Sequence, residues 1–159
     1  MADKRASEEA VASLMVEVRR LYDALQAFDL AAARKLGVNR TDLQCLLMLE
    51  HGPVRAGVLS SEVGLTSGST TALLDRLEER GFVRRRIAKD DRRAIEIELT
   101  PRGRKRIGAI YRSAYQAFAT RGAAHDDLDA AVRVLTDLVD GCREASQALA
   151  RTKQRRRRQ

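Results

Sequence analysis

The sequence predicts a mostly helical fold in which one small antiparallel β-hairpin lies between long helices near the two ends of the chain. Ala, Leu and Arg are abundant, whereas aromatic residues make up only 4% and Trp is absent, which favours helices over a β-sandwich. Apolar residues recur every three or four positions near both ends, and strand-like runs occur between residues 82 and 99. With 159 residues and 44% hydrophobic content, the chain can bury the core of one domain.

The first predicted helix, residues 1–36, carries an apolar seam that needs a partner. Its members are Val11, Leu14, Val18, Leu21, Leu25 and Phe28. Residues 101–150 repeat this pattern in two further helices, with seams at Ile107, Ile110 or Tyr111, Ala114 and Phe118, and at Leu128, Val132, Leu135, Val139, Cys142 and Leu149. The seams either form the intramolecular core or also pack against a second copy of the chain.

Shorter units follow the first helix. Thr41-Asp42 opens an apolar helix over residues 43–49, which stops near Gly52-Pro53 because proline lacks an amide donor. A short helix over residues 55–63 comes next and ends at Gly64.

The next helix, residues 67–80, starts after a tight turn. Thr66 is its expected N-cap and Gly81 its C-terminal stop. Two helices joined by Gly64-Leu65-Thr66 predict a helix-turn-helix.

Two strands, residues 82–87 and 94–99, flank a charged tip, Lys89-Asp90-Asp91-Arg92-Arg93. If the strands pair, Arg84 and Arg86 face Glu96 and Glu98, which partly neutralises the arginines. After the hairpin, Thr100 caps the next long helix and Pro101 takes its first position.

The positive charge of the chain is concentrated in two places. The net charge is +8; residues 54–106 hold 13 basic and 8 acidic side chains, and residues 151–159 hold 6 basic side chains and no acidic ones. A basic helix-turn-helix with its hairpin is typical of a nucleic-acid-binding module. The tail over residues 151–159 has no apolar residue, so we expect it to be disordered in isolation, adding either nonspecific DNA affinity or only solubility.

Several function classes are not indicated. No run of 18 apolar residues and no secretory signal occurs, so we expect a soluble, cytoplasmic protein. Cys45, Cys142, His51 and His125 lack the spacing of metal ligands, and no nucleophile with an adjacent base or glycine-rich phosphate loop is present. We therefore expect neither an enzyme nor a metal or other cofactor.

The start of the helix over residues 67–80 is the candidate site for DNA contacts. Ser67, Gly68, Ser69, Thr70 and Thr71 are small and mostly polar. Their hydroxyls can bond base edges or phosphates, the glycine allows close approach, and a helix N-terminus favours an anion. These residues could also simply cap the helix.

Arg76 lies further along this helix, on a different face from the core leucines. It is free for a phosphate unless Asp75, Glu79 or Arg80 engages it in a surface pair.

Two motifs resemble the MarR family of bacterial transcriptional regulators: residues 64–83, GLTSGSTTALLDRLEERGFV, and Asp90-Asp91-Arg92-Arg93 followed by Leu99-Thr100. The order of helices and hairpin around them is similar too, up to about residue 150. The resemblance implies a homodimeric winged helix-turn-helix, with residues 37–100 binding DNA and residues 1–36 and 101–150 forming the dimerisation helices. It also implies that a small molecule or oxidant weakens DNA binding by changing the separation of the two recognition helices.

The wing of the resembling family has an acidic residue two positions before an arginine. Asp91 and Arg93 match this pattern, so Arg93 is the expected minor-groove contact, and Asp91 is expected to orient its guanidinium. Arg92 is the neighbouring, weaker candidate.

The resulting prediction is a sequence-specific transcriptional regulator, expected to be a repressor, that binds a pseudo-palindromic operator as a homodimer. Two alternatives stay open: a nonspecific, nucleoid-type DNA-binding protein, and a regulator that senses oxidants through Cys45 or Cys142. The effector is not identified; the resemblance places its site near the first helix, residues 45–51, Tyr111 and Tyr115.

Overall fold

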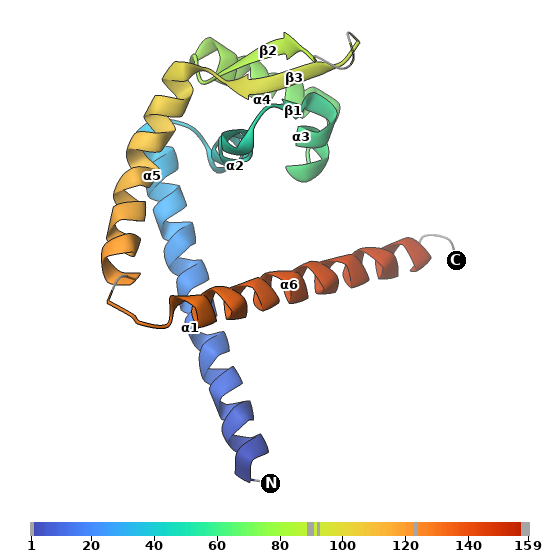
Figure 1. The fold of residues 1–159 in the computed structure, drawn as a ribbon. Coiled ribbons are helices and arrows are strands. Elements are labelled where there is room, and N and C mark those ends of the chain that lie inside the picture. Colours follow the sequence, from blue (N-terminus) through green and yellow to red (C-terminus); the bar gives the residue numbers. More distant parts are fainter. Residues whose placement is uncertain (1, 89–90, 92, 123, 157–159) are drawn as a thin grey trace. The chain divides into compact units, whose positions relative to one another are not determined.

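The computed structural model describes residues 2–88, 91, 93–122 and 124–156, and Figure 1 shows their elements. The elements are α1 (Ala2–Leu36), α2 (Arg40–Met48), the 3-10 helix η1 (Leu49–His51), β1 (Val54–Arg55), α3 (Ala56–Glu62), α4 (Ser67–Glu79), β2 (Val83–Ile87), β3 (Ile95–Leu99), α5 (Pro101–Gly122) and α6 (Leu128–Arg156). The prediction of a mostly helical chain with one small antiparallel sheet is confirmed. The chain divides into two compact units, Met1–Arg112 and Ser113–Gln159.

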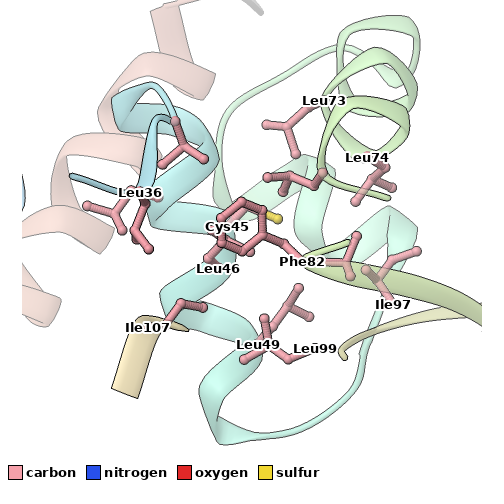
Figure 2. Packing of buried hydrophobic residues seen from close by; sticks show 14 of the residues in the cluster. Leu36, Cys45, Leu46, Leu49, Leu73, Leu74, Phe82, Ile97, Leu99 and Ile107 are labelled. Atoms are coloured by element: carbon pink, nitrogen blue, oxygen red, sulfur yellow. The ribbon is translucent and has the colours of Figure 1, made fainter. Parts of the chain in front are cut away.

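The first unit is built around one apolar core. Figure 2 shows Phe82 among side chains contributed by α2, α4, α5 and the sheet. Phe82, Leu46, Leu77, Ile97 and Ile107 are fully buried, so the helix-turn-helix, the hairpin and the start of α5 share one packed interior.

Side-chain caps and a left-handed glycine fix the ends of the helices. Thr66 Oγ1 accepts a bond from Ser69 N at 3.3 Å, and Thr100 Oγ1 accepts one from Gly103 N at 2.9 Å, which confirms both expected N-caps. Gly81 has a φ of 70°, and Phe82 N reaches back to Leu77 O at 2.9 Å, the bonding that ends a helix at a glycine.

The start of α2 differs from the prediction. The helix begins at Arg40, and its cap is Asn39, whose Oδ1 accepts a bond from Asp42 N at 2.8 Å. Asn39 is a favourable cap residue and stands where the chain leaves the turn after α1, so the helix starts before Thr41-Asp42, the expected opening.

The sheet has three strands in the order β1-β3-β2. Strands β2 and β3 pair antiparallel, with Arg84 opposite Glu98 and Arg86 opposite Glu96, as predicted. The additional strand β1 pairs Val54 with Ile97, so β3 is the central strand.

The apolar seams of the long terminal helices are exposed in the single chain. In α1, Val11 is 56% exposed and Leu25 42%; in α6, Val132 is 60% exposed and Leu135 49%. Helix α6 ends at Arg156. The expectation that residues 151–159 are disordered in isolation stays a prediction, and residues 157–159 lie outside the described part.

Candidate nucleic-acid interface

The first turn of α4 presents an exposed N-terminus with small side chains. Ser67, Gly68 and Ser69 are exposed, and Ser69 Oγ lies 3.0 Å from the capping hydroxyl of Thr66. Thr70 does not belong to this surface, contrary to the prediction: it is only 5% exposed, and its hydroxyl donates to Thr66 O at 2.9 Å. Its face of the helix packs against the core.

Arg76 is tied to the helix before the helix-turn-helix. Its Nη2 donates to Asp42 Oδ1 at 2.6 Å, and its Nη1 donates to Ala72 O at 3.3 Å. The partner is therefore Asp42 of α2, 34 positions away in sequence, and not one of the neighbours considered in the sequence. Because Asp42 is only 3% exposed, it depends on this guanidinium for its charge compensation.

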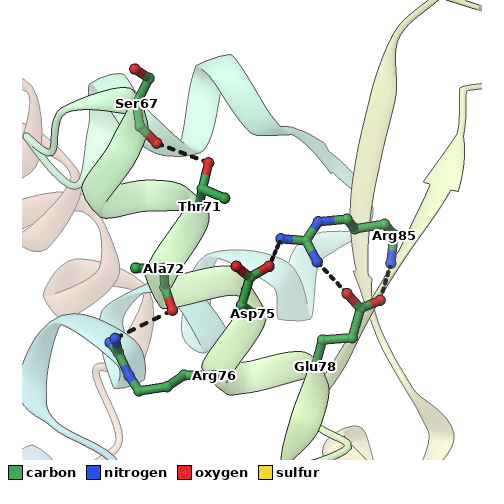
Figure 3. A network of polar contacts seen from close by, with 7 residues as sticks. All are labelled: Ser67, Thr71, Ala72, Asp75, Arg76, Glu78 and Arg85. Carbon is green, nitrogen blue, oxygen red and sulfur yellow. Dashed lines mark hydrogen bonds and ion pairs between the residues drawn. The ribbon is translucent and has the colours of Figure 1, made fainter.

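Arg85 of β2 links the wing to α4. As Figure 3 shows, its guanidinium bonds Asp75 at 2.5 Å and also Glu78, and its backbone N–H donates to Glu78 Oε1 at 3.1 Å. Burial lowers the pKa of Arg85, but the bonds to Asp75 and Glu78 outweigh this effect and raise it overall. This link, which the sequence analysis missed, sets the wing against α4 through charge-assisted bonds.

The strand arginines of the wing are neutralised across the hairpin. Arg84 pairs with Glu98 at 2.6 Å, and Arg86 pairs with Glu96 at 2.9 Å and with Glu98 at 3.3 Å. The predicted cross-strand pairing is confirmed. Because these two strand arginines are paired, a DNA contact by an unpaired arginine of the wing is expected at its tip.

At the wing tip, Asp91 holds the backbone turn. Its Oδ1 accepts a bond from Arg93 N at 2.9 Å, a side-chain-to-backbone turn bond. The expected role of Asp91, steadying the Arg93 guanidinium, stays a prediction beside this backbone bond. Arg93 is exposed and makes no ion pair with another residue that the structure describes; Arg92 lies outside the described residues.

The two cysteines stand in contrasting surroundings. Cys45 is 1% exposed, and burial, followed by the negative charge of Asp42, raises the pKa of its thiol to about 12. Cys142 is exposed on α6. Because the thiolate is the reactive form, Cys45 is unsuited to sensing oxidants in the folded chain.

We expect the Cys142→Ser variant to resist a thiol reagent such as DTNB at pH 8 until the chain is unfolded. Burial keeps the Cys45 thiol protonated and inaccessible to the reagent. The absorbance increase that reports its modification should therefore appear only after urea is added. Wild type in urea, which exposes both thiols, is the control for reagent activity. Rapid modification of the folded variant would show that Cys45 is accessible.

A pocket of about 440 Å³ opens beside α2 in the first unit. Its lining includes Asp29 of α1, Arg40, Leu47 and Met48 of α2, and His51. Tyr111 of α5 donates its hydroxyl to Asp29 at 2.7 Å. Burial, followed by the bond to Asp29 and nearby carboxylate charges, raises the pKa of Tyr111, so the phenol stays a donor. The pocket thus combines apolar walls with a few polar groups, as small-molecule sites do.

Two kinds of feature are absent from the described residues. No helix there is long and apolar enough to cross a membrane. No group of three or more His, Cys, Asp or Glu side chains there could hold a metal ion.

Comparison with known sequences identifies relatives of the region just described. A sequence model of the MarR family matches residues 36–94. The HTH-type transcriptional regulator YcgE of Bacillus subtilis is 36% identical over 113 residues, which span 70% of this chain and 73% of YcgE. The HTH-type transcriptional repressor MdtR of the same bacterium is 25% identical over 100 residues, 62% of this chain and 64% of MdtR.

Solved structures share the fold. A MarR transcriptional regulator from Methanosarcina mazei has a TM-score of 0.59 at 20% identity, covering 86% of this chain and 97% of its own. A MepR variant from S. aureus has a TM-score of 0.66 at 14% identity, covering 83% of this chain and 96% of its own. At these identities the likeness concerns the fold alone.

Proposed function

The chain belongs to the MarR family of DNA-binding transcriptional regulators, and from this membership we propose that it is a homodimeric repressor of a pseudo-palindromic operator. The observation that carries the proposal is the surface formed by α4 and the wing. The first turn of α4 exposes Ser67, Gly68 and Ser69, and the wing tip exposes an Arg93 that no described carboxylate neutralises. In this arrangement α4 enters a major groove while Arg93 reaches the neighbouring minor groove.

Helix α4 supplies contacts of two kinds. The exposed N-terminal turn favours a phosphate through its backbone N–H groups and dipole. Arg76, whose side chain is 47% exposed while it pairs with Asp42, adds a second phosphate contact at its open edge. A structurally similar MepR variant of S. aureus has a solved structure bound to an oligodeoxyribonucleotide.

The dimer is proposed from the exposed seams of α1 and α6. Apolar rows such as Val11 with Leu25 and Val132 with Leu135 are too long to stay in water without a partner helix. A second copy buries them and places two recognition helices about 10 base pairs apart on one side of the duplex. The protein then acts in the cytoplasm, on DNA.

The pocket between α1 and α2 is the proposed effector site. It adjoins α2, and α2 holds Arg76 of α4 through Asp42. A ligand that moves α2 therefore shifts the recognition helix, and the ligand's polar partners are Asp29, Arg40 and His51. The repressor role matches what the name of MdtR states for that protein.

Selection of operators from random duplexes, followed by footprinting of the full chain, tests the proposed function. We expect two protected half-sites that remain protected when residues 151–159 are deleted. The nonspecific, nucleoid-type alternative instead requires uniform protection that disappears with this tail. Repeating the footprint with candidate phenolic compounds tests for an effector.

Gly68→Ala is expected to weaken operator binding while leaving the fold intact or more stable. A Cβ at Gly68 meets nothing within 4 Å, and the backbone has no positive φ there, so the fold does not require glycine. Alanine should stabilise the helix by up to about 1 kcal/mol. Because the added methyl group hinders the close approach of a phosphate to the backbone, operator affinity should fall roughly tenfold, the equivalent of one lost bond to a phosphate.

Fluorescence anisotropy and urea unfolding measure the two effects of Gly68→Ala. Gly108→Ala, where a Cβ meets only Arg112 Nη2 at 4.0 Å, is the matched control and should change stability without changing affinity. Equal operator affinity of Gly68→Ala and wild type would remove this turn from the interface.

A further inference from the structure

The polar side chains in the middle of α4 already have partners inside the protein. Thr71 Oγ1 donates to Ser67 O at 3.0 Å, and Arg76 is bonded to Asp42 and to Ala72 O. Asp75 and Glu78 both hold Arg85, as Figure 3 shows. In each of these side chains the bonded atom is therefore already engaged inside the protein, and turning it fully toward a base edge would break that bond.

Two exposed groups in the same part of α4 are apolar and make no hydrogen bond: the methyl group of Thr71 and the Cβ of Ala72. Both residues are exposed. Because the Thr71 hydroxyl is held on Ser67 O, the χ1 angle is fixed and the methyl group cannot exchange places with the oxygen. Thr71 and Ala72 follow Gly68 by three and four positions, so they continue the helix surface that starts at the exposed N-terminus.

Base contacts by the charged side chains of this helix face would break existing ion pairs, whereas a methyl contact breaks none. An Arg76 that turned to a guanine would leave Asp42, which is 3% exposed, without its cation. An Asp75 that turned to a cytosine would give up its bond to Arg85 and leave Glu78 alone to link α4 to the wing. In the major groove, the one apolar mark of sequence is the C5-methyl group of thymine, which alanine and the threonine methyl group contact well.

We infer that α4 reads its half-site through methyl groups: Thr71 and Ala72 contact thymine C5-methyl groups in the major groove, and the Thr71 hydroxyl serves the helix. This inference rests on the proposed function, since it concerns how the same DNA-binding surface recognises sequence. It identifies a T·A pair opposite the middle of α4 in each half-site.

The test deletes matching methyl groups from the DNA and from the protein. The operator selected by the full chain is resynthesised with deoxyuridine replacing thymine, one symmetric pair of positions at a time. Thr71→Ser removes the protein methyl group and keeps the hydroxyl, whereas Thr71→Val keeps a methyl group and removes the hydroxyl. Thr70→Ser makes the same methyl deletion at the adjacent buried position and is the matched control.

We expect deoxyuridine at one symmetric pair to weaken wild-type binding by about fourfold per half-site. Thr71→Ser should lose a similar factor on the thymine operator and lose nothing further on the deoxyuridine operator. Thr71→Val and Thr70→Ser should keep the full response to deoxyuridine. All four proteins are compared by anisotropy at one salt concentration, since phosphate contacts make affinity salt-dependent.

Two results would overturn the inference, and they differ in what else they affect. If an operator is selected but Thr71→Val loses affinity while Thr71→Ser and deoxyuridine have no effect, the hydroxyl reads the base, and the proposed function stands. If wild type selects no operator at all, the proposed function and the inference fail together.

Discussion

Replacing Gly103 with alanine is expected to lower the free energy of unfolding by about 3 kcal/mol, because no space exists for a methyl group there. A Cβ at this position would lie 2.2 Å from Phe82 O and 2.9 Å from Phe82 C. These are backbone atoms, and the Phe82 side chain is fully buried in the core, so neither partner can turn aside. Helix α5 would have to move off the sheet edge, with a fall in melting temperature of roughly 10 °C.

Urea unfolding of Gly103→Ala beside Gly108→Ala separates this clash from the general effect of alanine in a helix. Both glycines lie in α5, but the Cβ of the control meets only the end of the Arg112 side chain at 4.0 Å. The control should therefore gain about 0.5–1 kcal/mol from lower backbone entropy in the unfolded chain. Gains of similar size in both variants would contradict the close packing of α5 on Phe82.

Arg93→Ala is expected to weaken operator binding by about tenfold per half-site, which becomes about a hundredfold when a dimer loses both wing contacts. The exposed guanidinium has no described ion-pair partner to leave, so its full charge is available to the narrow minor groove. The melting temperature and the mass of the free protein should stay unchanged, because the core and the apolar seams are untouched.

Arg84→Ala is the matched control for Arg93→Ala, since it removes the same charge from the same hairpin. Arg84 is already paired with Glu98 at 2.6 Å, and an exposed pair of this kind contributes little to stability. Anisotropy titrations at fixed salt should show a much smaller loss than for Arg93→Ala. Equal losses in the two variants would mean that the wing acts through its net charge and not through an inserted arginine.

The fold was predictable where neighbouring residues carry the signal. Strands β2 and β3 each start one residue later than predicted. The alternation of apolar and acidic residues over 94–99 is typical of a half-buried strand, so this strand was predictable from its own residues. The strand β1 has only two residues, too few for any pattern, and it exists because β3 offers a free edge.

The polar links of the site were beyond local sequence reasoning. Arg76 and Asp42 are 34 positions apart, and nothing in either neighbourhood selects the other. Thr70 is a different case, because it precedes Leu73, Leu74 and Leu77 by three, four and seven positions on the buried face of α4. Helical periodicity could have excluded it from the DNA contacts. The polar residues at this helix start masked that signal.

Competition between the selected operator and random duplex DNA, with the number of chains per complex determined in the same samples, tests the central claim most directly. If the chain is a sequence-specific dimeric regulator, two chains should bind each operator. Random DNA should compete at least about a thousandfold less well, and affinity should fall steeply as salt rises. Equal competition by random DNA, or one chain per operator, would contradict the account.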